Sequence, residues 1–314
     1  MLAESSQYVA LIDAARTRNK RALAQLVSLF ENTAKAADAA RMAVLEVLKD
    51  NPDTAAIIGF TGAPGVGKSS LINALSLELI RQNSDLSVAV VAVDPTSQVS
   101  GGSLLGDRTR TRFPADEDRL YFRSQPTNLE LGGVTQQTFQ AVRLLRHFFD
   151  LVIVETVGIG QSELTVSELV AHSFLVMQPM GGDQIQFLKS GIMEMPDAFI
   201  VNKCDEKKLA RETHNMLKGG LGSSLAVQGE TAEREIFLTS TLDNTGIADL
   251  ANHIGIDLIS TLDRDFAPAE QHLFERWVAQ AYGQFGLDKM RQRAHELPKS
   301  GVEAMQQAFR SLLG

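Results

Sequence analysis

The stretch GFTGAPGVGKSS, residues 59–70, decides the fold class. Gly62, Gly67, Lys68 and Ser69 match the pattern G-x-x-x-x-G-K-[ST], in which glycines let backbone N–H groups close around phosphate oxygens. The apolar run AIIGFT precedes the motif and a helical pattern follows it, so that a helix N-terminus favours the anion. A glycine-rich turn that matches by chance is the alternative, and the flanking strand and helix disfavour it.

The residue types of this loop predict which side chains contact the phosphates and which contact the metal ion. Lys68 would reach the β- and γ-phosphates of a nucleoside triphosphate, and the Ser69 hydroxyl would ligate Mg²⁺. We expect nucleotide contacts throughout the loop, from Gly62, Ala63, Pro64, Gly65, Val66, Gly67, Lys68, Ser69 and Ser70.

Apolar stretches alternate with helical patterns through the centre of the chain. We expect strands at 56–61, 88–93, 151–156, 174–178, 198–201 and 235–240. Most are apolar on consecutive residues, which is typical of strands covered on both faces. Strands that alternate with helices indicate an α/β protein with a doubly wound, mostly parallel sheet.

Helical patterns flank this α/β centre. Apolar residues recur at helical spacing from 7 to 50, until Asn51-Pro52-Asp53 interrupts them, and the chain turns helical and polar again after about residue 263. We therefore expect an N-terminal helical segment at 1–52, a P-loop nucleotide-binding domain at 53–262 and a C-terminal helical arm at 263–314.

The C-terminal arm carries more aromatic surface than a short solvated tail needs. Its large apolar residues include Phe266, Leu273, Phe274, Trp277, Tyr282 and Phe285. We hypothesise that this arm forms part of a twofold homodimer interface.

Composition narrows the class of protein. The chain has 314 residues, of which 44% are hydrophobic and 22% charged, as in a folded globular protein. A formal net charge of -8 disfavours a protein that coats nucleic acid or an anionic membrane. The sequence shows no secretory leader and no apolar run of about 20 residues that could span a membrane. The single cysteine, Cys204, excludes an internal disulfide or a multi-thiolate metal site, and we expect a cytoplasmic protein.

The tetrapeptide NKCD, residues 202–205, follows the fifth expected strand and fits the guanine-reading signature N-K-x-D. The Asp205 carboxylate can accept from guanine N1–H and from the exocyclic amine, a donor pair that adenine lacks. Asn202 would hold the loop and touch the base edge, and the stem of Lys203 can pack against the ring. Taken alone, the tetrapeptide could also be a helix start capped by an Asp. Behind this strand it favours GTP and GDP as ligands.

The stretch TSTLDNTG is a looser match to a further guanine-contacting loop. It follows the last expected strand, and its Ser240 could add a backbone contact to guanine O6. We include Ser240 and Thr241 among the expected nucleotide contacts.

Three acids are candidates for holding Mg²⁺. The stretch VVAVDPTSQVSGGSLLGDRTR leads an apolar strand into Asp94, which we expect to end the strand next to the P-loop strand, and then into a glycine-bearing loop with Asp107. That loop could close when γ-phosphate and metal are present. Glu155 ends a strand where many P-loop proteins carry a metal-binding Asp, although each acid could instead be a helix cap or a solvated charge. We predict Lys68, Asp94 and Glu155 as catalytic residues and Ser69, Asp94, Asp107 and Glu155 as metal ligands.

The sequence does not identify the residue that positions the attacking water. Gly158 resembles the hinge glycine of a second switch, but two residues separate it from Gln161, so the arrangement of small GTPases does not transfer. Arg108 and Arg110 could neutralise the transferring phosphate or could simply be solvated. We expect slow intrinsic turnover that a partner or dimerisation raises.

Four segments together resemble the MeaB/ArgK/MMAA family of SIMIBI-class P-loop GTPases. They read GFTGAPGVGKSSLINAL, VAVDPTSQVSGGSLLGDRTR, VETVGIGQSE and SGIMEMPDAFIVNKCD. The resemblance implies a homodimeric G-protein chaperone for an adenosylcobalamin-dependent acyl-CoA mutase, usually methylmalonyl-CoA mutase. Such a chaperone gates cofactor delivery and protects the mutase from inactivation. The resemblance also implies dimer contacts on the C-terminal helical arm.

Two stretches depart from the family pattern. PMGGDQIQFLKSG keeps Asp183, Gln186 and Lys189 of a segment that faces the mutase in the family, but it has Gln184 and Phe187 where an acid and a glycine are usual. YFRSQPTNLELGGV lacks the usual glycine after its first hydroxyls. Both departures concern the partner rather than the nucleotide, and they leave room for a mutase that acts on a different acyl-CoA.

Two other functions fit the same superclass. A metal-delivery GTPase needs clustered Cys or His near its switches, and this chain has one Cys and six scattered His. A P-loop kinase of the amino-acid-transport type needs an acceptor site, which the sequence does not supply. We interpret His147 as a packed structural histidine, and Met177, Met180, Met193 and Met195 as packing residues rather than soft-metal ligands.

Overall fold

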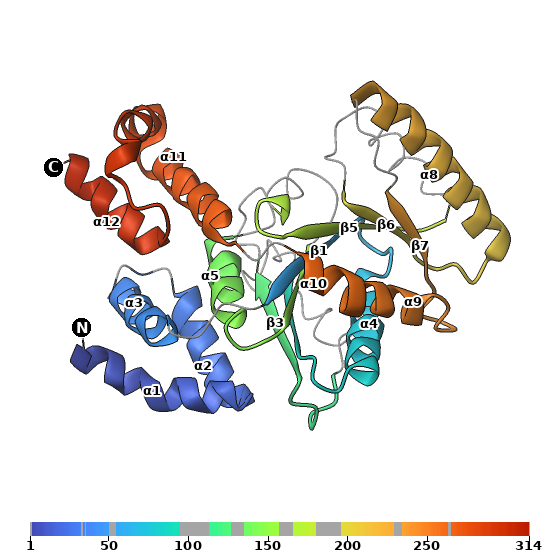
Figure 1. Cartoon of the computed structure of the whole chain (residues 1–314), viewed down its shortest axis with the longest axis horizontal. Helices are drawn as coiled ribbons and strands as arrows, with labels where there is room; N and C mark the ends of the chain where they lie inside the picture. Colours follow the sequence, from blue (N-terminus) through green and yellow to red (C-terminus); the bar gives the residue numbers. More distant parts are fainter. Residues whose placement is uncertain are drawn as a thin grey trace, which may run out of the picture.

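The computed structural model describes residues 2–32, 34, 36–49, 55–94, 113–126, 135–156, 166–179, 196–228, 234–262 and 265–313. Its centre is a seven-stranded sheet in which every neighbouring pair is parallel, with the order β3-β2-β4-β1-β5-β6-β7 (Figure 1). The strands are β1 Ala56–Thr61, β2 Val88–Asp94, β3 Leu120–Pro126, β4 Leu151–Glu155, β5 His172–Met177, β6 Ala198–Val201 and β7 Glu235–Leu238. The predicted doubly wound α/β sheet is confirmed.

Consecutive apolar residues in the strands pack into two separate hydrophobic cores, one on each face of the sheet. In β1, Ile58 and Phe60 pack into one hydrophobic cluster while Ile57 packs into another. Successive side chains of a strand point to opposite faces, so both faces of this sheet are covered. This double cover explains why the strands could be recognised from apolar runs.

Helices on one face include α4 Lys68–Gln82, α9 Ile247–Asn252, a π-helical turn η1 at His253–Leu258 and α10 Ile259–Thr261. The other face carries α5 Gln136–Leu145 together with the terminal helices (Figure 1). These are α1 Leu2–Arg16, α2 Lys20–Glu31, α3 Ala36–Leu48, α11 Ala267–Gln292 and α12 Val302–Leu313, with a 3₁₀ turn η2 at Ala294–Glu296. Helix α8, Lys207–Gln228, packs beside β6 and β7.

Local capping agrees with these boundaries. The Asn19 side chain accepts from the backbone N–H groups of Arg21 and Ala22 and so starts α2. The Thr135 hydroxyl accepts from Thr138 N–H and starts α5 in the same way.

Strand β3 was not predicted from the sequence. Its stretch LYFRSQP mixes apolar and polar residues, and it lies at the edge of the sheet beside β2. Arg123 in the middle of this strand pairs with Glu31 of α2, so a polar contact replaces the apolar cover of the central strands. Because β3 exists, NKCD follows the sixth strand of the sheet rather than the fifth.

The expected position of Asp94 is also wrong. Its strand β2 is not next to the P-loop strand β1, because β4 lies between them and pairs with both. The direct neighbour of β1 on that side is therefore the strand that ends in Glu155.

A buried ion-pair network joins the two terminal helical segments to α5. Glu303 of α12 lies 2.7 Å from Arg143 Nη1 and 3.2 Å from Arg41 Nε of α3, and it accepts from Gln140 Nε2 at 3.0 Å. Arg143 also pairs with Glu270 of α11 at 2.8 Å. The terminal helices and α5 consequently share one core, while the segment boundaries at 52 and 262 stay a prediction.

Most of the aromatic residues of the C-terminal arm pack inside the chain. Phe274 is fully buried and contacts the rings of Trp277 and Phe309, and Phe266 stacks on Phe139 of α5 with 5.0 Å between ring centroids. The argument from aromatic surface is therefore wrong for these rings, because the fold itself covers them. Phe285 is different, since 64% of it is exposed.

Candidate nucleotide site

The phosphate-binding loop lies between β1 and α4, where its glycines adopt backbone conformations that other residues avoid. Gly62 has a φ of 144°, and a Cβ there would lie 2.0 Å from the Val176 carbonyl oxygen of β5. Gly67 has a φ of 93°, and a Cβ there would lie 2.6 Å from Asn202 Nδ2. These glycines therefore let the loop pass against β5 and let the NKCD segment dock on it.

Lys68 is buried at the start of α4. Its ammonium donates to the carbonyl oxygens of Gly62 at 2.7 Å and of Ala63 at 3.2 Å. A cation is thus held inside the loop at the positive end of a helix, and this combination attracts phosphate oxygens.

Ser69 and Glu155 meet at the carboxyl ends of β1 and β4. The Ser69 hydroxyl donates to Glu155 Oε1 at 2.7 Å, and the Glu155 residue is only 6% exposed. A hydroxyl and a carboxylate at one point form the oxygen donor set that Mg²⁺ prefers. The residues present therefore fit a magnesium ion beside the loop.

The other predicted metal ligands are described less fully. Asp94 ends β2, but its side chain lies outside the described part of the structure, as does the whole of Asp107. Their roles as metal ligands stay predictions.

A hydroxyl pair that the sequence reasoning missed supports the Ser69–Glu155 junction. Thr156 Oγ1 donates to Thr61 Oγ1 at 3.1 Å, and Thr156 N–H donates to the Phe60 carbonyl oxygen. These contacts fix the end of β4 to the start of the loop. Both expected strands, AIIGFT and LVIVET, end in threonine, which was the available signal.

Asn202 connects the base-reading segment to the phosphate loop. It is fully buried, and its amide nitrogen donates to the Val66 carbonyl oxygen at 2.9 Å. Thr239 Oγ1, another residue not singled out from the sequence, donates to Asn202 Oδ1 at 3.2 Å. The predicted role of Asn202 in holding the loop matches these contacts, since both ends of its amide are engaged.

Lys203 crosses from NKCD to the same loop. Its ammonium donates to the Gly65 carbonyl oxygen at 2.7 Å and to Gln178 Oε1 at 3.1 Å. Its backbone φ is 61°, in the left-handed region that a lysine seldom occupies. The next residue, Cys204, points inward, and burial raises the pKa of its thiol.

Asp205 and Ser240 approach each other at the other end of this segment. Ser240 Oγ lies 3.4 Å from Asp205 Oδ1, and the Ser240 backbone N–H donates to the Thr245 carbonyl oxygen at 2.9 Å. The backbone N–H that we expected to contact guanine O6 thus has a partner within its own loop. Thr241 and the 82% exposed Leu242 follow on that loop.

The structure brings together Lys68, Ser69 and Glu155 on one side and Asn202, Lys203, Asp205 and Ser240 on the other, with the phosphate loop touching both groups. Several other predicted residues lie outside the described ranges: Arg108, Arg110, Gly158, Gln161, Met180, Asp183, Gln184, Gln186, Phe187, Lys189, Met193 and Met195.

Residues interpreted as packing groups behave as expected where the structure describes them. Met177 is fully buried, and burial lowers the pKa of His147 to about 4. Among the described residues, no three His, Cys, Asp or Glu side chains gather in a way that could hold a metal ion. No helix in the described ranges has the length and apolarity needed to cross a membrane.

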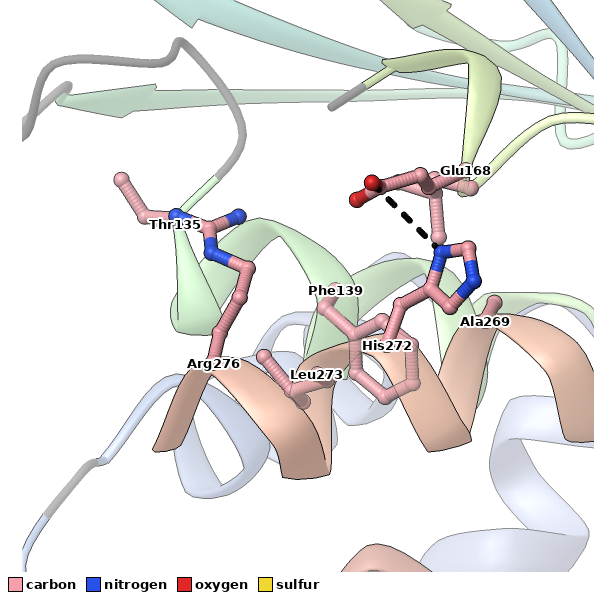
Figure 2. Close-up of a pocket in the computed structure, with 8 residues that line it drawn as sticks. Thr135, Phe139, Glu168, Ala269, His272, Leu273 and Arg276 are labelled. Carbon is pink, nitrogen blue, oxygen red and sulfur yellow. Dashed lines mark ion pairs between the residues drawn. The ribbon is translucent and has the colours of Figure 1, made fainter. Parts of the chain in front are cut away.

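Two hollows lie along α11. Figure 2 shows the smaller one, where His272 and Glu168 face each other with 3.6 Å between Nδ1 and Oε1. The larger is a cavity of about 250 Å³ lined by Ala55, Ala171 and Arg146, whose guanidinium lies 4.3 Å from the centre of the Phe266 ring. Ala55 and Ala171 directly precede β1 and β5, so this cavity opens at the amino ends of the strands, opposite the phosphate loop.

Comparison with known proteins agrees with this geometry. A family model described as "Methylmalonyl Co-A mutase-associated GTPase MeaB" matches residues 23–273. The chain belongs to this family. As a MeaB-family member with a P-loop GTPase fold, it is a GTPase that hydrolyses GTP, and the predicted family is confirmed.

Individual relatives support the assignment to the MeaB family. A probable GTPase of Mycobacterium tuberculosis (strain H37Rv) is 39% identical over 245 residues, which cover 76% of this chain and 71% of that protein. The mitochondrial methylmalonic aciduria type A homolog of Caenorhabditis elegans is 47% identical over 149 residues, which cover 47% of this chain and 37% of that protein. Among solved structures, one described as a LAO/AO transport system kinase has a TM-score of 0.59 at 21% identity and covers 98% of this chain and 97% of its own, which shows the shared fold.

Proposed function

We propose that this GTPase is a chaperone for an adenosylcobalamin-dependent acyl-CoA mutase of the methylmalonyl-CoA mutase kind. It gates loading of the cobalamin cofactor and protects the mutase from inactivation. The observation that carries the proposal is the match of residues 23–273 to a family described as mutase-associated GTPases.

The site supports GTP and GDP as the ligands. Lys68 and the phosphate loop hold the phosphates, while the Asp205 carboxylate accepts from guanine N1–H and its exocyclic amine. Asn202 and Lys203 fix the base-reading segment to the loop through Val66 and Gly65. One nucleotide can therefore span both groups of residues.

Magnesium fits beside the phosphates. Ser69, Glu155, Asp94 and Asp107 would hold it, directly or through water, and the ion would supply positive charge against the phosphate oxygens. The protein's own part is to position the phosphates and to fix Glu155 against Ser69.

Turnover is slow in the isolated chain and rises when a partner is bound. The sequence does not identify a residue that positions the attacking water, and GTPases often complete this step with help from another protein. We also propose that the chain acts as a homodimer through its C-terminal helical arm.

The test is a GTPase assay with purified full-length chain, alone and with candidate cobalamin-dependent acyl-CoA mutases. A cognate mutase should raise GTP turnover, and GDP and a non-hydrolysable GTP analogue should change the affinity for that mutase by different factors. The Lys68→Ala variant is the control, because stimulated turnover must disappear with this lysine. If no cobalamin-dependent mutase changes turnover, the chaperone proposal fails and only the GTPase remains.

The same preparation separates the two alternative functions. A kinase of the amino-acid-transport type would move the γ-phosphate to a protein acceptor rather than to water. A metal-delivery GTPase would bind a transition metal with a stoichiometry that depends on the nucleotide state.

A further inference from the structure

We propose that Gln178 is a positioning residue of the guanine subsite and that it acts through Lys203. The inference rests on the proposed function, in which Lys203 belongs to the base-reading segment. Gln178 lies outside every motif that the sequence singled out, and its role comes from a contact between two neighbouring strand ends.

The sheet places the two side chains together. Gln178 directly follows β5, and Lys203 comes two residues after the end of β6. These strands pair in parallel with Met177 opposite Val201, so both chains leave the sheet at the same edge. There Gln178 Oε1 accepts from Lys203 Nζ at 3.1 Å.

The lysine ammonium is thereby shared between two elements. It has three donors, and two of them are accounted for by Gln178 Oε1 and by the Gly65 carbonyl oxygen of the phosphate loop at 2.7 Å. The Gly65 contact ties the side chain to the phosphate loop, and the Gln178 contact ties it to the end of β5. With only one of them, the long stem would keep more of its rotamer freedom.

Lys203 needs this support because its backbone is in an unfavourable conformation. Its φ of 61° places it in the left-handed region, where residues with a Cβ are held only when their surroundings impose the geometry. Residues held in this way cluster at ligand clamps. Gln178 therefore helps to set the direction of the stem that packs against the base before any nucleotide arrives.

The consequence is specific to the base end of the nucleotide. A stem that is already ordered loses less entropy on binding, so affinity for guanine nucleotides depends on Gln178. The phosphates contact Lys68 and the loop backbone instead, and their binding does not depend on this glutamine. Weaker GDP binding with normal pyrophosphate binding is therefore the expected signature of losing Gln178.

The experiment uses the full-length chain and the Gln178→Ala variant. We expect Kd for GDP and for a non-hydrolysable GTP analogue to rise by the same factor, about threefold to tenfold, as for one charge-assisted hydrogen bond in an exposed setting. The Kd for inorganic pyrophosphate should stay unchanged. KM for GTP should rise while kcat stays within about twofold, because the phosphates and the metal ligands are not touched.

Two further variants test whether the effect passes through Lys203. Gln178→Glu keeps an acceptor for the ammonium, and its Kd for GDP should stay close to that of the unchanged protein. In a Lys203→Met background the stem remains but the donor is gone, so adding Gln178→Ala should change Kd no further. Gln284→Ala removes an exposed glutamine of α11 that bonds Asp288, and as the matched control it should leave GDP binding unchanged.

The outcomes distinguish this inference from the proposed site. If Lys203→Met and Asp205→Asn weaken GDP binding but Gln178→Ala does not, the positioning role is refuted and the guanine site stands. If neither Lys203→Met nor Asp205→Asn weakens it, the proposed base-reading segment itself fails. If Gln178→Ala weakens pyrophosphate binding as much as GDP binding, the substitution damages the phosphate loop, and the positioning role is likewise refuted.

Discussion

Glu155 occupies the point where the phosphate loop and its neighbouring strand end together. Its carboxylate accepts from the Ser69 hydroxyl at 2.7 Å, inside a site where the residue is only 6% exposed. A buried carboxylate needs a compensating donor or cation, and here both a hydroxyl and a magnesium ion can serve. From the sequence we expected Asp94 to end the strand next to β1. The structure places Glu155 there instead, so Glu155 is the acid on the strand beside the phosphate loop.

We predict that Glu155→Ala and Asp94→Ala lower GTP hydrolysis by at least about tenfold, since each removes an oxygen from the proposed metal site. GDP binding without magnesium should stay nearly intact, because the phosphate loop holds the β-phosphate itself. Lys68→Ala should weaken both. Single-turnover hydrolysis and GDP titration in the presence of a chelator measure the two effects. Normal hydrolysis by the acid variants would make Glu155 and Asp94 structural residues only.

Among the secondary-structure elements, the strands predicted from the sequence are those with consecutive apolar residues, and they include the partly exposed edge strand β7. β1, β2, β4 and β6 are covered on both faces and appear in the sequence as apolar runs. β3 is an edge strand with Arg123 and Ser124 at its centre, so its sequence contains no apolar run from which the strand could be predicted. The position of β4 between β2 and β1 is a matter of long-range pairing, which local sequence does not encode.

The parts of the candidate site that could be predicted are those formed by residues close together in the sequence. The phosphate loop and NKCD are local motifs, whose residues must be close in sequence to do their work. Gln178, Thr239 and the Thr61–Thr156 pair come from strand ends that are distant in sequence and meet only in the sheet. Such supporting residues can be found only once the strand order is known.

The buried network on α12 makes a prediction about stability and pH. Burial alone would raise the pKa of Glu303, but the charge and hydrogen bond of Arg143, together with Arg41, hold this pKa below its ordinary value. A carboxylate whose pKa is lower in the folded state stabilises the protein above its unfolded pKa of about 4.5, and this stabilisation is lost as the pH falls below it.

We therefore predict that Glu303→Gln destabilises the chain by roughly 3 kcal/mol at neutral pH, because it removes the buried carboxylate that Arg143 and Arg41 share and leaves each with one acidic partner, Glu270 or Asp38. The same variant should flatten the loss of stability between about pH 5 and lower values. Denaturant unfolding over a pH series measures both effects. Glu296→Gln, which breaks an exposed ion pair with Arg293, is the matched control and should behave like the unchanged protein. Equal unfolding midpoints for the two variants would contradict a stabilising role of the network.

At the scale of the whole molecule, the terminal helices belong to one core. The cluster that contains Ile12 of α1 and Val44 of α3 also contains Phe274 of α11 and Phe309 of α12. Removing the C-terminal arm would therefore expose apolar surface and the buried partners of Glu303. If the truncated chain were monomeric, the cause could be damage to this core, and the result would not identify the dimer interface. A test of assembly has to leave this core intact.

Phe285 offers that test, because 64% of it is exposed, whereas the other aromatic residues of the arm are fully buried (Phe274, Phe309) or partly buried (Phe266, Trp277, Tyr282). A large exposed aromatic side chain on α11 is suited to an interface between two copies of the chain. We predict that the full-length chain sediments as a dimer at micromolar concentration. Phe285→Asp should shift it to monomer while leaving the affinity for GDP within about twofold, since the substitution replaces an apolar ring with a charge at a twofold contact and leaves the nucleotide site untouched. Analytical ultracentrifugation with and without GDP measures the change. A monomeric full-length chain would refute the homodimer, whereas a dimer that survives Phe285→Asp would place the interface on another face of the molecule.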